Sequence, residues 1–523
     1  MPESTTAAAP PGGGPPAFEA PAMSKRQVWT VLIGLMLALL LAALDQTVVS
    51  TALFTIVKDL DPVHGLSQIS WVVTVYLLAV TASMPLYGKI SDLYGRKPVL
   101  IFALVLFLAG SALCGLASGM GSLILFRTIQ GLGAGGMMSL VMAIIADMIP
   151  PRERGRYSGL GVAVMAVASV AGPFAGGFFT EAHTLFAVTT SWRWAFWINL
   201  PIGLFALVVV TAVLTLPVRR RGHRIDFLGA ALIVGAVCAT LLVTVWGGNL
   251  YDWASTQIVS LAVAAVLLFV AFFWWESKAS EPIFPPRLFR LPVFRTASVL
   301  LFIIGFAMMG SIVYITLYLQ LADGLSPTSA GLHLMPMTVG MAIASIVAGR
   351  LVSKFGKYKV FPIVGTGLAA IAMGLMSLLA PDTSATTLSL YLVLLGLGLG
   401  QVMGIPQLAV QNSVDPGDMG SATSATSFTR AMGQSFGAAA FGAILTARLA
   451  VNMPAGIPGI GANGAPNVAQ VRALPAALQT EVVDAFVKSA DTVFQVTAAV
   501  LVVAFVMALL LKELPLRKRA GAK

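Results

Sequence analysis

The sequence predicts an all-α polytopic membrane protein with fourteen transmembrane helices. Hydrophobic residues make up 58% of the 523 residues and charged residues only 10%, whereas a soluble domain carries about 25% charged residues. The mean hydropathy is +0.89, and the apolar residues fall into segments of about 20, the length that crosses a bilayer. So little charge cannot cover a water-exposed surface, which excludes a soluble enzyme, a nucleic-acid-binding module and a disordered protein.

Fourteen apolar segments are expected to cross the membrane. They cover 28–53, 69–89, 98–117, 122–147, 158–180, 194–217, 226–247, 256–275, 296–320, 329–351, 359–380, 386–412, 420–446 and 491–512. The Ala/Pro/Gly-rich residues 1–27 form an expected disordered cytoplasmic tail, and 513–523 a basic one.

The positive charges test this map. With both termini in the cytoplasm, 25 of the 32 Lys and Arg fall on the cytoplasmic side and 5 on the outer side. The remaining two, Arg127 and Arg430, lie inside spans. Cytoplasmic loops of membrane proteins are enriched in Lys and Arg, so this distribution of positive charge favours an even number of spans with both termini inside. The expected location is a cell membrane, plasma or inner.

An internal repeat divides the spans into 6 + 2 + 6. Gly88 and Gly95 recur as Gly349 and Gly356, and two further glycine patterns recur at nearly the same offset: Gly131, Gly133 and Gly135 as Gly396, Gly398 and Gly400, and Gly172 and Gly176 as Gly433 and Gly437. The pattern predicts a six-helix bundle at 28–217, two inserted helices with a cytoplasmic linker at 218–295, and a second bundle at 296–512 with an outer loop at 447–490. Such repeated bundles are typical of secondary transporters, whose site lies between them at mid-membrane depth. The inserted spans are expected to flank the bundles and supply no coupling residue.

Four polar residues inside spans are candidates for proton coupling or substrate contact: Asp45, Arg127, Gln130 and Arg430. Asp45, the only acid placed well inside a span, lies about 25 Å along its helix, in the outer half of the membrane; the alternative is a helix-end Asp in outer solvent. Arg127, one turn before Gln130, could lower the pKa of an acid or extend to the interface. Arg430 must pair with something: a structural bond to carbonyls is as plausible as substrate contact.

Two glycine-containing segments are candidates for conformational control. In loop 88–98, Gly88 and Gly95 permit a tight turn, and Asp92 can pair with Arg96 or a neighbouring helix to form a latch; a solvated turn is the alternative. Asp147, at the cytoplasmic end of its span, is expected to have a structural role. In the fifth span, Pro173 permits a bend and the glycines let helices approach closely, although plain packing is equally compatible. The residues of these segments are Gly88, Asp92, Gly95, Arg96 and Lys97 for the latch, and Gly172, Pro173, Gly176 and Gly177 for the hinge.

These segments resemble the motifs of the major facilitator superfamily. Loop 88–98 is similar to its signature G-x-x-x-D-x-x-G-R-[KR], Arg127–Gly131 to R-x-x-Q-G, and Gly172–Gly177 to the fifth-helix antiporter motif. Leu44–Val49 and Trp192–Pro201 resemble the fourteen-span drug:proton antiporter branch. Three positions depart from the pattern: Ser50 stands where Asn is usual, Phe54 where Pro is usual, and Ser353 replaces the Asp92 of the first loop, which makes a second latch doubtful.

The resemblance implies a proton-driven exporter of amphipathic, often cationic drugs that alternates access between its two bundles. Alternatives are a dedicated exporter of an endogenous lipid or secondary metabolite and, more remotely, a channel or intramembrane enzyme. No catalytic motif is present, so we expect no enzyme, no cofactor and no metal; Cys114 and Cys238 are interpreted as small core residues. The expected partners are a small molecule, protons and lipid, without nucleic acid, and a monomer is expected to function. The expected cavity lining is Tyr76, Phe306, Met309, Tyr314, Met403 and Gln407.

Overall fold

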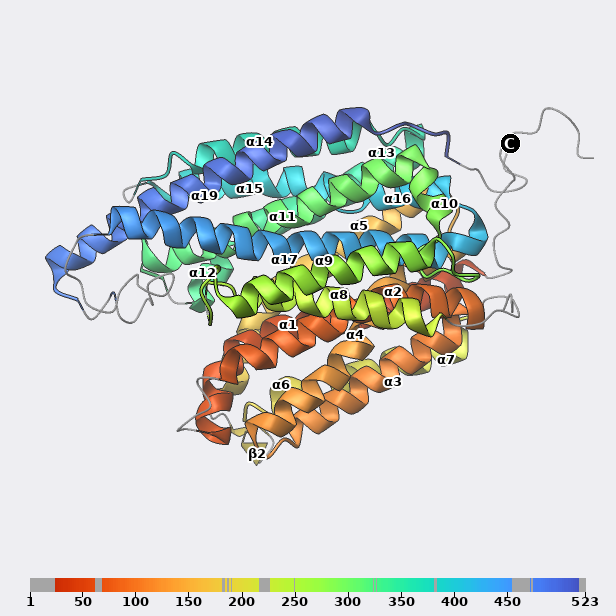
Figure 1. Cartoon of the computed structure of the whole chain (residues 1–523), viewed down its shortest axis with the longest axis horizontal. Helices are drawn as coiled ribbons and strands as arrows, with labels where there is room; N and C mark the ends of the chain where they lie inside the picture. Colours follow the sequence, from red (N-terminus) through yellow and green to blue (C-terminus); the bar gives the residue numbers. More distant parts are fainter. Residues whose placement is uncertain are drawn as a thin grey trace, which may run out of the picture.

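Long helices lying side by side make up the structure, a computed structural model of the chain (Figure 1). It describes residues 24–61, 68–180, 184–185, 188–189, 191–215, 226–248, 250–322, 324–325, 327–380, 383–453, 471 and 474–516. The helices are α1 (Lys25–Leu60), α2 (Ile69–Tyr94), α3 (Arg96–Gly115), α4 (Met120–Met148), α5 (Pro151–Thr180), α6 (Trp194–Trp197), α7 (Asn199–Val213), α8 (Phe227–Trp246), α9 (Thr256–Glu276), α10 (Pro286–Arg290), α11 (Pro292–Leu321), α12 (Pro327–His333), α13 (Met335–Phe355), α14 (Val360–Met376), α15 (Ala385–Val402), α16 (Ile405–Ser413), the 3-10 turn η2 (Pro416–Asp418), α17 (Met419–Asn452) and α19 (Ala476–Leu510). A small antiparallel hairpin pairs β1 (Thr184–Leu185) with β2 (Val188–Thr189).

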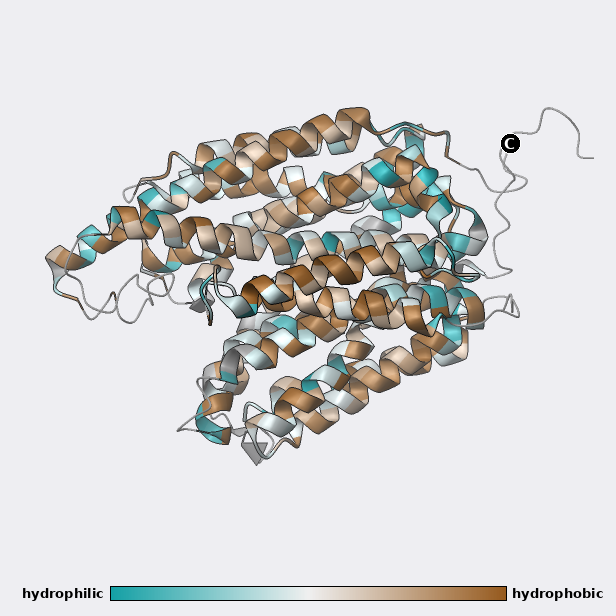
Figure 2. Ribbon diagram, viewed as in Figure 1, coloured by the Kyte–Doolittle hydropathy of each residue, from teal (hydrophilic) through white to brown (hydrophobic). Residues whose placement is uncertain are grey.

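The helices have the length and polarity of membrane spans. Among the described residues, 13 helices are long and apolar enough to cross a bilayer, and the shorter apolar helix Val360–Met376 brings the set to the fourteen that the sequence predicts. Large apolar side chains such as Phe205, Val266 and Leu267 are more than half exposed. Apolar residues cover the middle of the bundle in Figure 2, and hydrophilic ones gather toward its ends. This surface suits lipid, and the chain is a multi-pass membrane protein.

Several expected boundaries need correction. The predicted outer loop 447–490 is too long, because α17 continues to Asn452 and α19 begins at Ala476. Asp491 therefore lies well inside a helix, and Asp45 is not the only acid there. The expected span 386–412 agrees with the candidate span Ala385–Ser413, which has a short break at Met403 and Gly404 between α15 and α16. Most of the expected terminal tails, the arginines at 219–224 and the loop at 454–470 fall outside the described residues.

The recurring glycines make corresponding contacts in the two halves. A Cβ added to Gly131 on α4 would lie 2.7 Å from the Tyr76 carbonyl oxygen on α2, and one on Gly396 of α15 would overlap the Met337 carbonyl on α13. The fourth helix thus approaches the second in each repeat. The exact limits of the expected domains stay predictions.

The same correspondence holds for the later pair of glycines. Gly172 on α5 lies against Thr47 of α1, and Gly433 on α17 lies against the Phe302 carbonyl of α11. The fifth helix of each half therefore packs closely on the first. The inserted helices α8 and α9 pack on each other, and α8 also contacts α2 and α17, one helix from each half.

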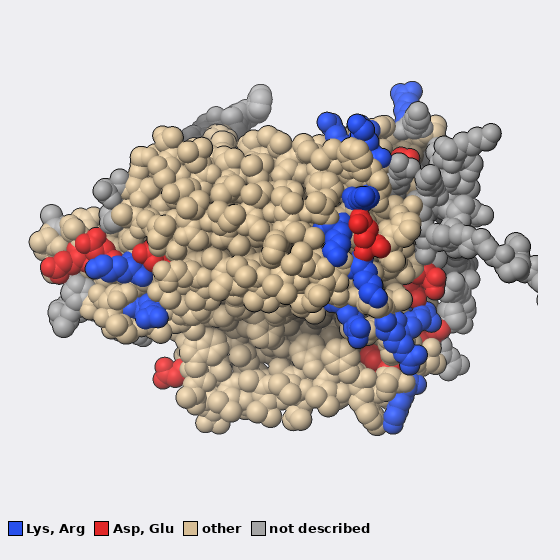
Figure 3. Space-filling view, turned by 90° about the horizontal axis from the view of Figure 1, so that it is seen from above, with Lys and Arg blue, Asp and Glu red and all other residues tan. Residues whose placement is uncertain are grey.

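Positive side chains gather at one end of the bundle, which we call the basic end. The turn between α2 and α3, the short helix α10 and the last residues of α13 lie there (Figure 1), and Figure 3 shows Lys and Arg concentrated at the same end. Toward the opposite end, α1 and α17 diverge in Figure 1. The basic end is the one that the sequence predicts to face the cytoplasm.

Candidate functional site

Asp45 forms a buried ion pair with Arg127. Asp45 on α1 is 0% exposed and Arg127 on α4 is 1% exposed. The Arg127 Nη1 lies 2.6 Å from the Asp45 Oδ2. Asp45 is twenty residues after the start of α1 at the basic end, about 30 Å along the helix. The charges therefore neutralise each other deep in the bundle, in the half away from the basic end.

Two amides complete the shell around the Asp45 carboxylate. Gln130 Nε2 donates to Asp45 Oδ1 at 2.7 Å, and Asn199 Nδ2 donates to the same oxygen at 3.2 Å and to Ser111 Oγ at 3.0 Å. Gln130 Oε1 in turn accepts from Arg127 Nη1 at 2.8 Å. Helices α1, α3, α4 and α7 thus meet at one buried polar cluster, which we call the Asp45 cluster (Asp45, Ser111, Arg127, Gln130 and Asn199).

Tyr76 covers the guanidinium of this cluster. The Arg127 Cζ lies 4.0 Å from the centre of the Tyr76 ring, a cation–π distance. The Tyr76 hydroxyl donates to the Ala42 carbonyl on α1 at 3.1 Å. Tyr76 therefore holds α2 against α1 and α4.

A second polar cluster joins the two halves at the basic end. The Asp92 carboxylate accepts from the Gly420 N–H at 3.1 Å and from the Ser421 N–H at 2.8 Å, both in the first turn of α17. Arg96 Nη1 lies 2.6 Å from Asp92 Oδ1, and Arg96 Nε donates to Asp147 Oδ2 at 2.8 Å. A carboxylate at a helix N-terminus satisfies free N–H groups and interacts favourably with the helix dipole. Asp92 therefore links α2 of the first half to α17 of the second.

The fifth-helix glycines pack α5 on α1. A Cβ on Gly176 would overlap the Thr51 hydroxyl and lie 2.7 Å from the Val48 carbonyl oxygen. By contrast, a Cβ on Gly177 would meet nothing within 4 Å. Helix α5 runs without interruption through Pro173. The segment is thus a close-contact face at Gly172 and Gly176, and Gly177 lies outside it.

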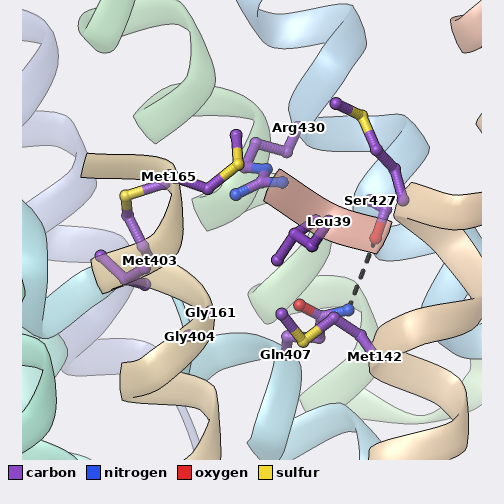
Figure 4. A pocket seen from close by; sticks show the side chains of 11 residues that line it. Leu39, Met142, Gly161, Met165, Met403, Gly404, Gln407, Ser427 and Arg430 are labelled. Carbon is purple, nitrogen blue, oxygen red and sulfur yellow. Dashed lines mark hydrogen bonds between the residues drawn. The ribbon is translucent and has the colours of Figure 1, made fainter. Parts of the chain in front are cut away.

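A cavity lies between the two halves at the level of Arg430 (Figure 4). Its lining comes from α1, α4 and α5 on one side and from the α15–α16 junction and α17 on the other: Leu39, Met138, Met142, Gly161, Val162, Met165, Met403, Gly404, Gln407, Ser427 and Arg430. None of these residues is acidic. Gln407 Nε2 donates to Ser427 Oγ at 3.4 Å.

Comparison with known proteins identifies the family. The model of the Major Facilitator Superfamily matches residues 35–227 and 211–438. The chain belongs to this superfamily. It is 41% identical over 487 residues to an uncharacterized MFS-type transporter of Mycobacterium tuberculosis, covering 92% of this chain and 69% of that protein. It is 37% identical to Multidrug resistance protein 3 of Bacillus subtilis, covering 80% and 79%.

A solved structure has the same fold. The proton:xylose symporter XylE aligns with a TM-score of 0.58 at 15% identity, covering 92% of this chain and 95% of that one. At this identity the likeness concerns the fold alone. As a member of the Major Facilitator Superfamily, the chain is a membrane transporter and not an enzyme. Among the described residues, no group of three or more His, Cys, Asp or Glu could hold a metal ion.

In the structure of this chain, some of the expected site residues lie together and others lie apart. Asp45, Arg127 and Gln130 share one cluster, but Arg430 lies apart from it, in the cavity. Gly95, with φ 94°, forms the turn before α3, in a backbone region that favours glycine. Lys97 does not join the latch, because its ammonium donates to the Thr211 carbonyl at 2.8 Å.

The expected cavity lining is divided between this cavity and other parts of the two halves. Met403 and Gln407 line the cavity, but Tyr76, Phe306, Met309 and Tyr314 do not. Tyr76 belongs with Arg127, and Phe306 and Tyr314 pack on Phe441, with ring centroids at 4.9 Å and 6.3 Å. These three residues thus contact other side chains of their own half.

Sequence reasoning missed Asn199, Ser111 and the contact between Asp147 and Arg96. Asn199 stands inside the Trp192–Pro201 segment, which the sequence marks as a family motif but not as part of a site. Neutral amides and hydroxyls inside apolar spans are the signal that could have found the first two. Asp147, for which the sequence predicts a structural role, shares Arg96 with Asp92.

Proposed function

We propose that this transporter exports amphipathic compounds from the cytoplasm in exchange for protons, by alternating access, as a monomer in the cell membrane with both termini inside. The observation that carries the proposal is the Asp45 cluster: an acid fully buried in a membrane-spanning helix and paired with one arginine. Intramembrane acids are costly and mark ion or proton pathways. The Bacillus subtilis relative, named as a multidrug resistance protein, supports export.

Proton binding at Asp45 would rearrange the cluster. A neutral carboxyl loses its ionic attraction to Arg127, whereas Arg127 keeps its bond to Gln130 Oε1. Because the surroundings are apolar, that loss is larger than it would be in water. Protonation thus leaves Arg127 without its counter-charge, and α1 and α4 are no longer held together by opposite charges.

The packing of α1 provides a route from this cluster to the interface between the halves. Thr47, two residues after Asp45, donates to the Ala168 carbonyl of α5 at 3.1 Å. Helix α5 then meets α13 of the other half, where a Cβ on Gly155 would lie 2.8 Å from the Gly349 carbonyl oxygen. A shift of α1 therefore acts on a helix that contacts both halves.

The basic end is held closed in this arrangement. Asp92 joins α2 to α17, and Arg287 on α10 makes two bonds to Asp418, at 2.7 and 2.6 Å, at the start of α17. We infer that the structure corresponds to the state closed toward the cytoplasm, and that opening requires these bonds to break.

Dye transport in inverted vesicles tests the proposal. Wild-type vesicles should accumulate several amphipathic dyes only while a pH gradient exists. Asp45→Asn should abolish this accumulation, and Asp59→Asn, an exposed acid on the same helix, should leave it intact. Gradient-driven accumulation by Asp45→Asn at the wild-type rate for every dye would refute the coupling role.

A further inference from the structure

Arg430 is a half-buried cation for which the described residues provide no partner. It lies eleven residues after the start of α17 at the basic end, about 17 Å along the helix and near mid-membrane depth. Within the part of the chain that the structure describes, its guanidinium makes no hydrogen bond or ion pair. Figure 4 shows it directed into the cavity beside Leu39 and Met165. A charge inside a membrane-spanning helix and beside apolar side chains is costly unless it is paired, so an anion would be stabilised in the cavity.

The rest of the lining gives no competing charge. Its apolar part consists largely of four methionines, flexible side chains that adapt to varied shapes: Met138, Met142, Met165 and Met403. Its neutral polar side chains are Gln407 and Ser427. An amphipathic molecule could place its apolar portion among the methionines and its polar head at Arg430.

The broken helix at the cavity adds to the positive potential. Helix α15 ends at Val402 and α16 begins at Ile405, so Gly404 of the lining is the N-cap of α16. The first N–H groups of a helix lack partners within the helix and carry partial positive charge. The N-terminus of α16 therefore favours the same sign of ligand as Arg430.

The cavity is separate from the Asp45 cluster. Leu39 lines the cavity from α1, and Asp45 lies six residues further on, about 9 Å along the helix. The acid is also enclosed by its own partners, so it cannot neutralise a ligand in the cavity. A cationic ligand there would meet Arg430 with no compensating carboxylate.

We propose that Arg430 binds the anionic head of the substrate, and that the preferred substrates are amphipathic anions such as aryl or alkyl carboxylates. This proposal rests on the proposed export function and names its substrate class, in place of the cationic drugs that the sequence resemblance implies.

A matched ligand series tests the proposal. Tritiated 4-phenylbutyrate, 4-phenylbutanol and 4-phenylbutylamine share one skeleton and differ in charge. Equilibrium dialysis at pH 7 against the purified full chain should show at least tenfold tighter binding of the carboxylate than of the amine. Arg430→Gln should remove this preference while retaining binding of the alcohol, which reports an intact cavity, and Arg430→Lys should retain part of it.

The control is Arg448→Gln, an exposed arginine on the same helix, which should bind all three ligands like the wild type. No carboxylate preference in the wild type, or an unchanged preference in Arg430→Gln, would overturn the proposal. Equilibrium dialysis measures binding without a proton gradient. The proposed substrate class can therefore fail independently of the proposed proton-coupled export. Selective binding without gradient-driven export would refute only the proposed function, and gradient-driven export of the amine without carboxylate selectivity would refute only the substrate class.

Discussion

Two arginines inside membrane-spanning helices, one in each half, have opposite surroundings. Arg127 in the first half contacts a carboxylate, an amide oxygen and a tyrosine ring. Arg430 in the second half faces methionines and has no counter-charge among the described residues. The first charge is balanced inside the protein, and the proposed function has a proton change that balance. The proposed substrate class has an anionic ligand balance the second charge. Under these two proposals, the repeat provides one framework for two different tasks.

The two halves differ again at the basic end. In the first half, Asp92 bonds to the start of α17. At the corresponding place in the second half, the Ser353 hydroxyl donates to the Gly349 carbonyl of its own helix at 2.9 Å. The end of α13 is instead close to Tyr358, whose N–H donates to Glu513 at 2.9 Å and fixes the segment after α19. The end of α2 thus provides a charged contact to the other half through Asp92, and Ser353 at the corresponding place on α13 is a neutral residue bonded to its own helix.

The largest expected difference is in the free energy of unfolding when each arginine is replaced by glutamine. Arg127→Gln leaves Asp45 as an uncompensated buried charge, and breaking a buried pair in this way typically costs about 3–5 kcal/mol of unfolding free energy. Arg430→Gln removes an unpaired charge and should be neutral or stabilising. Denaturant unfolding of the purified variants measures both. Equal losses in the two variants would contradict the assigned difference.

The sequence was sufficient for the fold and for the charged part of the site. Hydropathy and the glycine offset predict the spans and the repeat, and a charge inside a span identifies Asp45, Arg127 and Arg430. It could not identify Asn199 and Ser111 as partners of Asp45, because a neutral polar side chain leaves little trace in an apolar span. It also misplaced Tyr76 and Phe306, because a helix that is apolar on all sides does not reveal which face meets the cavity.

The latch should show the second-largest effect. Asp92→Asn removes the negative charge from two backbone bonds and one ion pair, and hydrogen bonds to charged groups contribute about 1.5–3 kcal/mol each. Even about 1.4 kcal/mol shifts a two-state equilibrium tenfold. Spin labels at Tyr94 and Phe355, exposed residues at the basic ends of α2 and α13, should report longer distances in this variant. Ser353→Ala is the matched control, and longer distances there too would show that the asymmetry between the halves is unimportant.

A smaller effect is expected at the contact between α1 and α5, where a methyl group on Gly176 should raise proton leak and one on Gly177 should not. Gly176→Ala places a methyl group against Thr51 and the Val48 carbonyl, and overpacking typically costs about 1–3 kcal/mol. Gly177→Ala has open space. Proton flux into liposomes without substrate should rise for Gly176→Ala only, at equal protein levels. Identical flux in the two variants would mean that the segment is ordinary packing with no part in coupling.

The smallest effect concerns an acid outside the membrane-spanning part, which serves as a reference for Asp45. Asp59 accepts hydrogen bonds from Trp192 at 2.8 Å and from Arg193 at 3.0 Å, and these bonds hold the pKa of its carboxyl below the usual value of about 4. The ionised form is the stabilised one, so its contribution is complete above that usual value and is lost as the pH falls through the lowered pKa of the folded protein.

The thermal midpoint difference between the wild type and Asp59→Asn should therefore stay constant from pH 5 to 8 and shrink below about pH 4. Across the same range of pH 5 to 8, Asp59→Asn should leave the pH profile of efflux unchanged, whereas Asp45→Asn should abolish gradient-driven efflux. If Asp59→Asn altered that profile, the pH response would belong to the exposed end of α1, and the buried pairing of Asp45 with Arg127 would no longer be needed to explain it.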